Sequence, residues 1–196
     1  KLTGIIAYPI TPFTADGSQP DLNKLAQSIE LLLQNGCDAI APLGSTGESA
    51  YLSFAEWQKV AQHSVQVVAK RVPVIIGISE LTTDQAINKA RFATEIGADA
   101  IMVIPVSYWK LTDDEIFGYY KAIAAEVSLP VMIYNNPATS GVDMSPELIV
   151  KMFRGIPQIT MVKESTGDIQ RMHKIYQLSS GAVSYTHLTL PTIYSV

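Results

Sequence analysis

Six short apolar runs recur along this chain of 196 residues, and they constrain its fold more than any other feature. Most of the runs are nearly continuous in apolar residues, which is typical of strands buried on both faces of a parallel sheet. The runs are residues 4–10, 38–43, 74–78, 100–104, 131–135 and 160–163. The longer amphipathic segments between them carry helix-start signals, such as the Ser–Glu spacing of a capping box at residues 53–56. This alternation predicts an α/β fold with a parallel sheet.

The positions of the less common residues favour one of two α/β architectures. A doubly wound open sheet and a (β/α)8 TIM barrel, of which this chain would supply about six units, both fit the alternation. The first run is not followed by G-x-G-x-x-G, and the sequence has no G-x-x-x-x-G-K-[ST], which weakens the nucleotide-binding open sheet. Proline, glycine, lysine and aromatic residues cluster just after the runs, where a barrel builds its active site. We therefore predict the barrel and keep the open sheet as the alternative.

Composition excludes several classes of protein. Hydrophobic residues make up 47% of the chain and charged residues 16%, which indicates a filled core and not a disordered chain. The net charge of −4 and the pI near 5.3 come without a basic stripe, so no nucleic-acid partner is expected. No apolar run reaches the roughly 18 residues of a membrane span, so no membrane partner is expected. The single cysteine, Cys37, cannot form an internal disulfide, which favours the cytoplasm.

Lys163 ends the sixth run, and a lysine at the end of a buried strand has two interpretations. Burial disfavours the ammonium form and leaves a free amine that can attack a ketone. Alternatively, the side chain extends its charged end to solvent. Tyr134 ends the fifth run, and residues at the same end of neighbouring parallel strands can face each other. Its phenol could then transfer protons while Lys163 forms an imine, or its ring could fill the end of the barrel.

The loop at residues 44–49 follows the second run and could bind a carboxylate. Its two glycines allow a tight turn close to a ligand. Its backbone amides, with the hydroxyls of Ser45 and Thr46, precede a predicted helix. A plain tight turn is the alternative. His63 and His173 are not spaced as metal ligands, so we predict no metal site.

Four motifs in order resemble those of the dihydrodipicolinate synthase and N-acetylneuraminate lyase superfamily. They are TPF at residues 11–13, GSTGES at 44–49, YNNPATSG at 134–141 and VKESTG at 162–167. The resemblance covers residues 2 to about 183. It implies a (β/α)8 barrel that assembles into homodimers or homotetramers. It also implies an enzyme without a cofactor that activates pyruvate or a related small 2-keto acid as a lysine imine, for aldol addition, cleavage or dehydration.

The same resemblance implies roles for individual residues. Lys163 matches the imine-forming lysine, Tyr134 the acid–base residue, and Ser45 the hydroxyl that relays protons to Tyr134. Thr46, with Gly47 beside it, matches the position that holds the carboxylate of the 2-keto acid. These residues are the catalytic and substrate-binding candidates of the chain.

Two further positions concern the second substrate. In the synthases, one subunit of the dimer contributes an aromatic hydroxyl to the active site of the other. Tyr108 is the nearest candidate for this residue, although the loop spacing differs by one residue. The synthases also carry an arginine that grips the carboxylate of aspartate semialdehyde, and this chain has Thr139 at the matching position. A hydroxyl cannot replace the charged fork of an arginine. The sequence therefore favours an aldolase or dehydratase of keto-sugar acids over 4-hydroxy-tetrahydrodipicolinate synthase itself, which stays an alternative.

The end of the resemblance sets the expected domain organisation. We expect an incomplete barrel at residues 1–183 and an unrelated tail at residues 184–196, which lacks the glycine-containing turn expected next. An arc with two bare edges would be poorly stable. Two further alternatives to the lyase are therefore an inert fragment and a non-catalytic barrel that binds 2-keto acids.

Overall fold

The computed structural model describes residues 2–181 and 184–186, in which short strands and helices alternate. The strands are β1 (Ile6–Ala7), β2 (Ala39–Ile40), β3 (Ile75–Glu80), β4 (Ala100–Pro105), β5 (Val131–Asn135), β6 (Ile159–Glu164) and β7 (Ser184–Thr186). The helices are α1 (Leu22–Gln34), α2 (Phe54–Val68), α3 (Thr83–Glu95), α4 (Asp113–Ala125), α5 (Pro137–Ser140), α6 (Pro146–Gly155) and α7 (Ile169–Leu178), with a 3-10 turn η1 (Ser49–Tyr51).

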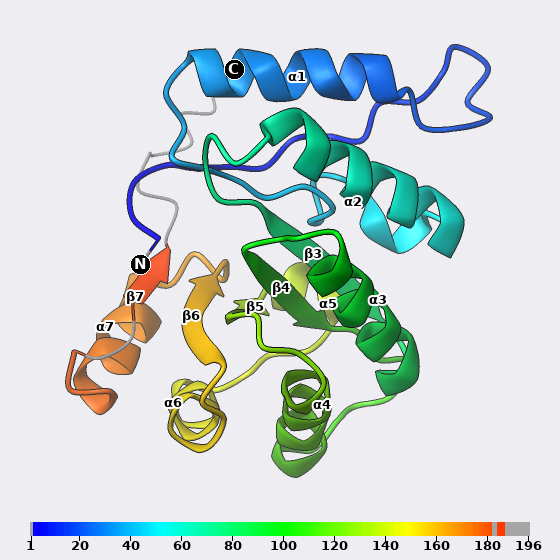
Figure 1. Ribbon diagram of the computed structural model, residues 1–196. Helices are drawn as coiled ribbons and strands as arrows, with labels where there is room; N and C mark the ends of the chain where they lie inside the picture. The colour runs from blue at the N-terminus through cyan, green and yellow to red at the C-terminus, as the bar shows by residue number, and fades with distance from the viewer. Residues whose placement is uncertain (1, 182–183, 187–196) are drawn as a thin grey trace, which may run out of the picture.

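The strands pair in parallel and follow one another in chain order. β1 pairs with β2, and β3 to β7 form a five-stranded sheet. A parallel bridge between Ile40 and Val74 joins the two groups. Figure 1 shows the strands in the middle and the helices around them. Strands in chain order inside a layer of helices are the arrangement of a (β/α)8 barrel, and the described residues form an arc of six β/α units. The predicted fold class is confirmed.

Two hydrophobic clusters cover the two faces of this arc. The larger cluster lies between the strands and the helices and includes Ile76, Ile133 and Trp57. The smaller cluster faces the barrel interior, and its buried members are Ala39, Ala41, Ile75, Ala100, Met102, Ile104, Met132 and Tyr134. Because both faces are buried, the strands are apolar almost throughout, which explains the continuous runs in the sequence.

Capping side chains start the helices that follow the strands. Ser53 accepts a hydrogen bond from the amide of Glu56, whose carboxylate accepts one from the amide of Ser53, so α2 begins with a complete capping box. Thr112 and Glu115 form the same box at the start of α4. These caps fix where each loop ends and therefore how the loops lie at the carboxyl ends of the strands.

The first two strands and the last strand differ from what the sequence predicts. The first two runs form strands of only two residues each, since Pro9 and Pro42 lack the amide that a longer ladder needs. Strand β7 was not predicted, and it pairs with β6 opposite residues 161–163. Within the predicted tail, residues 187–196 lie outside the described part of the chain. The predicted boundary at residue 183 stays a prediction.

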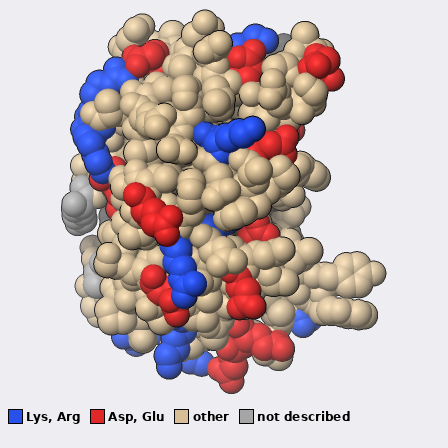
Figure 2. Space-filling view, turned by 45° about the vertical axis from the view of Figure 1, so that its right-hand side comes forward, with Lys and Arg blue, Asp and Glu red and all other residues tan. Residues whose placement is uncertain are grey.

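Charged side chains of both signs are intermixed on the surface seen in Figure 2. Several form exposed ion pairs, such as Arg91 with Glu126 at 2.6 Å and Lys151 with Asp114 at 2.9 Å. Exposed pairs of this kind contribute little stability each. Among the helices that the structure describes, none combines the length and the apolar character needed to cross a membrane.

Candidate active site

The amine of Lys163 lies against two aromatic rings at the carboxyl ends of the strands. β5 and β6 pair in a register that sets Tyr134 opposite Lys163, and Nζ of Lys163 lies 4.2 Å from the centre of the Tyr134 ring. Tyr8 comes directly after β1, and its ring centre lies 3.7 Å from the same nitrogen. Lys163 is half-buried, so its amine contacts the faces of these rings, whereas the amine of an exposed lysine contacts water.

This environment lowers the pKa of both reacting candidates. Burial lowers the pKa of Lys163 below its usual range, and attraction to Tyr134 offsets only part of this effect. Burial by itself would raise the pKa of Tyr134, but the hydrogen bond with Ser45, the charge of Lys163 and the hydrogen bond from Asn136 outweigh it and lower this pKa. Both shifts move the groups toward neutral pH, where acid–base catalysis is most effective.

Two side chains hold the phenol oxygen of Tyr134. Asn136 donates a hydrogen bond from Nδ2 to this oxygen at 2.9 Å, and Oγ of Ser45 lies 3.4 Å from it. A donor such as Asn136 stabilises the phenolate, whereas a hydroxyl such as that of Ser45 can either donate or accept. Ser45 therefore connects the phenol to the loop at residues 44–49, and its role in relaying protons to Tyr134 stays a prediction.

Contacts with neighbouring backbone hold this loop in place. Thr11 donates a hydrogen bond to the carbonyl of Gly47 at 2.7 Å, which joins the TPF and GSTGES motifs. A Cβ at Gly77 of β3 would lie 2.1 Å from the carbonyl oxygen of Leu43, so only glycine allows the strand to approach the loop this closely. Leu43 and Glu48 have left-handed φ angles of 63° and 53°, and such strain persists only where the surroundings hold it.

A polar network ties β5 to β6 on the face opposite Lys163 and Tyr134. Successive residues of a strand point to opposite faces, so Asn135 and Glu164, which pair in register, point toward the helix layer. Nδ2 of Asn135 lies 3.1 Å from both carboxylate oxygens of Glu164. Nε of Arg171, from α7, lies 3.4 Å from the same carboxylate, whose side chain is only 1% exposed.

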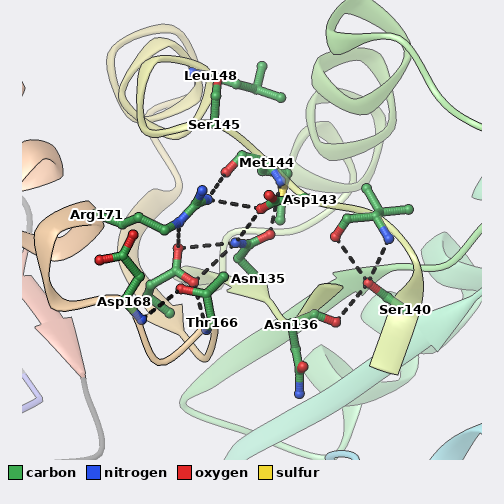
Figure 3. Close-up of polar contacts among 12 residues, drawn as sticks. Asn135, Asn136, Ser140, Asp143, Met144, Ser145, Leu148, Thr166, Asp168 and Arg171 are labelled. Atoms are coloured by element: carbon green, nitrogen blue, oxygen red, sulfur yellow. Dashed lines mark hydrogen bonds and ion pairs between the residues drawn. The ribbon is translucent and has the colours of Figure 1, made fainter. Parts of the chain in front are cut away.

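The same network reaches both loops that follow these strands. Oδ1 of Asn135 accepts a hydrogen bond from the amide of Met144 at 3.0 Å, and Arg171 bonds Asp143 at 3.0 Å (Figure 3). The amide of Thr166 donates to Glu164 at 3.0 Å. One buried carboxylate thus fixes the two strand ends and the start of each loop, and thereby the spacing of Tyr134 and Lys163.

A cleft opens beside Tyr134. Its lining residues are Leu43, Gly44, Ser45, Glu48, Ser49, Ala50, Tyr51, Gly77, Ile78, Ser79, Met102, Ile104, Val106, Tyr134, Thr139 and Ser140. Among the described residues, the lining contains hydroxyls and one carboxylate, that of Glu48, but neither lysine nor arginine. Oγ atoms of Ser49 and Ser79 lie 3.0 Å apart and form a hydrogen bond. This cleft is uncharged apart from Glu48 and can accept a polar ligand.

The model of the dihydrodipicolinate synthetase family matches residues 1–186. The chain belongs to this family. A 4-hydroxy-tetrahydrodipicolinate synthase from Agrobacterium fabrum is 41% identical over 169 residues, which are 86% of this chain and 57% of that protein. The chain therefore spans less than two thirds of the length of the curated relatives it matches.

Solved structures of the dihydrodipicolinate synthetase family share the fold. A proposed dihydrodipicolinate synthetase from Pseudomonas aeruginosa superposes with a TM-score of 0.92 at 54% identity, over 94% of this chain and 63% of that one. A prophage protein of the family from Escherichia coli K12, solved in complex with pyruvate, gives 0.88 at 34% identity, over 94% and 63%.

The other predicted site residues of this family member fall in different places. Thr139, in α5, lines the cleft, whereas Thr46 is exposed and does not line it. Gly47 is buried in the loop. Tyr108 is 86% exposed, packs edge-on against Trp109 with ring centres 5.2 Å apart, and lies outside the cleft. Within residues 2–181 and 184–186, the structure places no group of three or more histidine, cysteine or acidic side chains that could hold a metal ion.

Sequence reasoning missed three groups of this site: Tyr8, Asn136 and the network around Glu164. Asn136 stood inside the YNNPATSG motif, and an amide directly after a candidate acid–base residue was the available signal. Glu164 follows Lys163, and a carboxylate in a strand buried on both faces needs a partner. Tyr8 had only its position at the end of the first run as a signal.

Proposed function

We propose that this protein is a Schiff-base lyase or synthase that activates pyruvate or a related 2-keto acid through Lys163. The observation that carries the proposal is the half-buried amine of Lys163, which lies against two aromatic rings and beside a phenol of lowered pKa. A lowered pKa supplies the neutral amine that attacks a ketone. Membership of the dihydrodipicolinate synthetase family supports the same chemistry.

In the proposed reaction, the lone pair of Lys163 forms a bond to the ketone carbon. One amine proton and one proton from Tyr134 then leave with the ketone oxygen as water. The nitrogen keeps its remaining proton and a positive charge, so the imine can accept the electrons of a neighbouring C–C or C–H bond. Ser45 returns protons to Tyr134 across the 3.4 Å contact. These steps use the side chains of the chain and need neither a metal nor a cofactor.

The loop at residues 44–49 is the proposed site for the carboxylate of the keto acid. Its backbone is held rigidly by Thr11 and by the close approach of Gly77. A rigid loop presents its amides and the hydroxyls of Ser45 and Thr46 without reorganisation, which favours an anion. Gly47 allows the tight turn, since a Cβ there would lie 3.0 Å from the amide nitrogen of Leu43.

We propose that the second reactant is a hydroxylated fragment without a carboxylate. The cleft beside Tyr134 contains hydroxyls, including those of Ser49, Ser79 and Thr139, and its only ionisable carboxylate is that of Glu48. An anionic aldehyde would meet no cation there. The second candidate is 4-hydroxy-tetrahydrodipicolinate synthase, which the name of the Agrobacterium fabrum relative favours.

A substrate screen tests this function. We expect pyruvate release from at least one 2-keto-3-deoxy sugar acid or from sialic acid, and we expect Lys163→Ala to release none. Hydroxy-oxoglutarate, whose cleavage would also yield an aldehyde with a carboxylate, is expected to release no pyruvate. Condensation of pyruvate with aspartate semialdehyde would support the synthase instead, with the Agrobacterium fabrum relative as positive control. Pyruvate binding that survives Lys163→Ala, without turnover of any substrate, would indicate a binding protein and contradict the proposal.

The length of the chain requires one further arm of the screen. A chimera that adds the C-terminal part of the Pseudomonas aeruginosa relative tests the inert-fragment alternative. If the chain alone is inactive and the chimera is active, the chain is an inert fragment of an active enzyme. Assembly into two or four copies, a cytoplasmic location and the domain boundary at residue 183 stay predictions from the sequence.

A further inference from the structure

We propose that Tyr8 is a further catalytic residue of this site, and that the face of its ring stabilises the positive charge on the nitrogen of Lys163 through imine formation. The proposal rests on the proposed function, because it concerns the protonated imine that Lys163 forms with the keto acid. It adds a group that acts on the reacting nitrogen itself and that carries no proton in the reaction.

The first argument is the geometry around the nitrogen. The centre of the Tyr8 ring is 3.7 Å from Nζ of Lys163, nearer than the 4.2 Å of Tyr134. A cation within about 6 Å of a ring centre is attracted by the negative face of the ring. Among the residues that the structure describes, no carboxylate forms an ion pair with Lys163. Ring faces are therefore the groups that compensate its charge.

The second argument is how the fold positions Tyr8. β1 ends at Ala7, so Tyr8 lies at the same end of the barrel as Tyr134 and Lys163. Its ring packs with the interior cluster, and a Cβ at Gly44 would lie 3.7 Å from Cδ1 of Tyr8. This separation is ordinary van der Waals contact, so the ring lies directly beside Gly44 in the loop at residues 44–49. A side chain packed in this way keeps its face toward the nitrogen without rearrangement.

The third argument is the charge that the nitrogen carries during the reaction. The resting ammonium and the protonated imine are both cations, whereas the attacking amine between them is neutral. Burial disfavours both cations, and the ring face offsets this effect. The imine accepts electrons only while it is protonated. A ring that favours the cation therefore increases the fraction of adduct that can react.

The hydroxyl of Tyr8 is not needed for this role. Burial, with a smaller contribution from Tyr134, raises the pKa of Tyr8 above its usual range, so the phenol stays protonated. Tyr134, whose pKa is lowered, remains the proton carrier. The two tyrosines that contact this nitrogen thus have different roles. Tyr134 transfers protons, and Tyr8 stabilises the positive charge.

Two variants separate the ring face from the hydroxyl and from packing. Tyr8→Phe keeps the face, whereas Tyr8→Leu keeps an apolar side chain but removes the face. The measurement is the amount of adduct on the chain that borohydride traps, as a function of pyruvate concentration. It is made at a pH above the pKa of the Lys163 amine, where the resting amine is neutral and only the protonated imine carries the charge that the ring stabilises. We expect Tyr8→Phe to behave like the wild type and Tyr8→Leu to need about tenfold more pyruvate for half-maximal trapping. Equal behaviour of Tyr8→Leu and the wild type would overturn the proposal, as would equal losses in both variants.

A second measurement does not depend on the imine. The rate at which acetic anhydride labels Lys163 as a function of pH reports the pKa of its amine. The titratable side chains that contact Lys163, within the described part of the chain, are Tyr8 and Tyr134. We expect Tyr8→Leu to lower this pKa, because the ammonium loses the ring face, and Tyr8→Phe to leave it unchanged. A mere packing defect would admit water and raise the pKa; that result, or an unchanged pKa, would contradict the role of Tyr8. If the wild type forms no adduct, the proposed function fails, and the labelling still decides the contact with Tyr8.

Discussion

Replacing Tyr134 with phenylalanine is expected to slow the exchange of the methyl protons of pyruvate with solvent deuterons by about 100- to 10,000-fold. The exchange requires the imine to lose and regain a proton at the carbon beside it. Tyr134→Phe keeps the ring against Lys163 but removes the hydroxyl that Asn136 and Ser45 hold. The rate follows directly from proton NMR spectra recorded in deuterated water.

A matched variant separates this effect from the general loss of a phenol in the cleft. Tyr51 also lines the cleft but is 88% exposed, and among the described residues its hydroxyl forms no hydrogen bond with Ser45, Tyr134 or Lys163. We expect Tyr51→Phe to exchange pyruvate protons at the wild-type rate. Equal losses in Tyr51→Phe and Tyr134→Phe would show that Tyr134 is not the acid–base group, and so would an unchanged rate in Tyr134→Phe.

Replacing Arg171 with leucine is expected to lower the free energy of unfolding by about 3 to 5 kcal/mol. The side chain of Glu164 is 1% exposed, and within the described part of the chain Arg171 is the cation that pairs with its carboxylate, at 3.4 Å. Without Arg171, this charge stays buried among neutral donors such as Asn135. The measurement is a urea unfolding curve followed by circular dichroism.

Two controls accompany the Arg171 prediction. Arg91 pairs with Glu126, but both side chains are largely exposed, at 53% and 40%, so Arg91→Leu should cost no more than about 1 kcal/mol. Adding Glu164→Gln to Arg171→Leu removes the buried charge and should restore part of the loss. A loss in Arg171→Leu no larger than that in Arg91→Leu would show that the network does not stabilise the strand ends.

The pairing of Tyr134 with Lys163 could be predicted because it follows from repetition. Each ends a neighbouring apolar run, and parallel strands in chain order bring equivalent ends together. The position of Ser45 just after the second run indicated only a loop that could bind a carboxylate, and the resemblance to the family implied its link to Tyr134. The distance and the hydrogen bonds depend on register, which the sequence does not specify to a single residue.

Tyr8 and Glu164 show why the rest of the site could not be predicted. The first run, residues 4–10, continues past the end of β1, so Tyr8 looked like one more buried strand residue. Glu164 lies on the outward face of its strand, and its partner Arg171 comes from a helix. Contacts between layers depend on how the helix packs, which no local pattern encodes. Tyr108 is exposed and lies outside the cleft of this chain, and its expected role across a dimer stays a prediction.

Borohydride reduction in the presence of pyruvate, followed by peptide mass spectrometry, tests the role of Lys163 most directly. The account predicts one reduced pyruvate adduct, located on Lys163, absent without pyruvate and absent in Lys163→Ala. Lys89 is a sharp internal control, because it is buried but paired with Glu80 and should stay unlabelled. An adduct on another lysine, or an unmodified Lys163 peptide at saturating pyruvate, would contradict the assignment of Lys163 as the imine-forming residue.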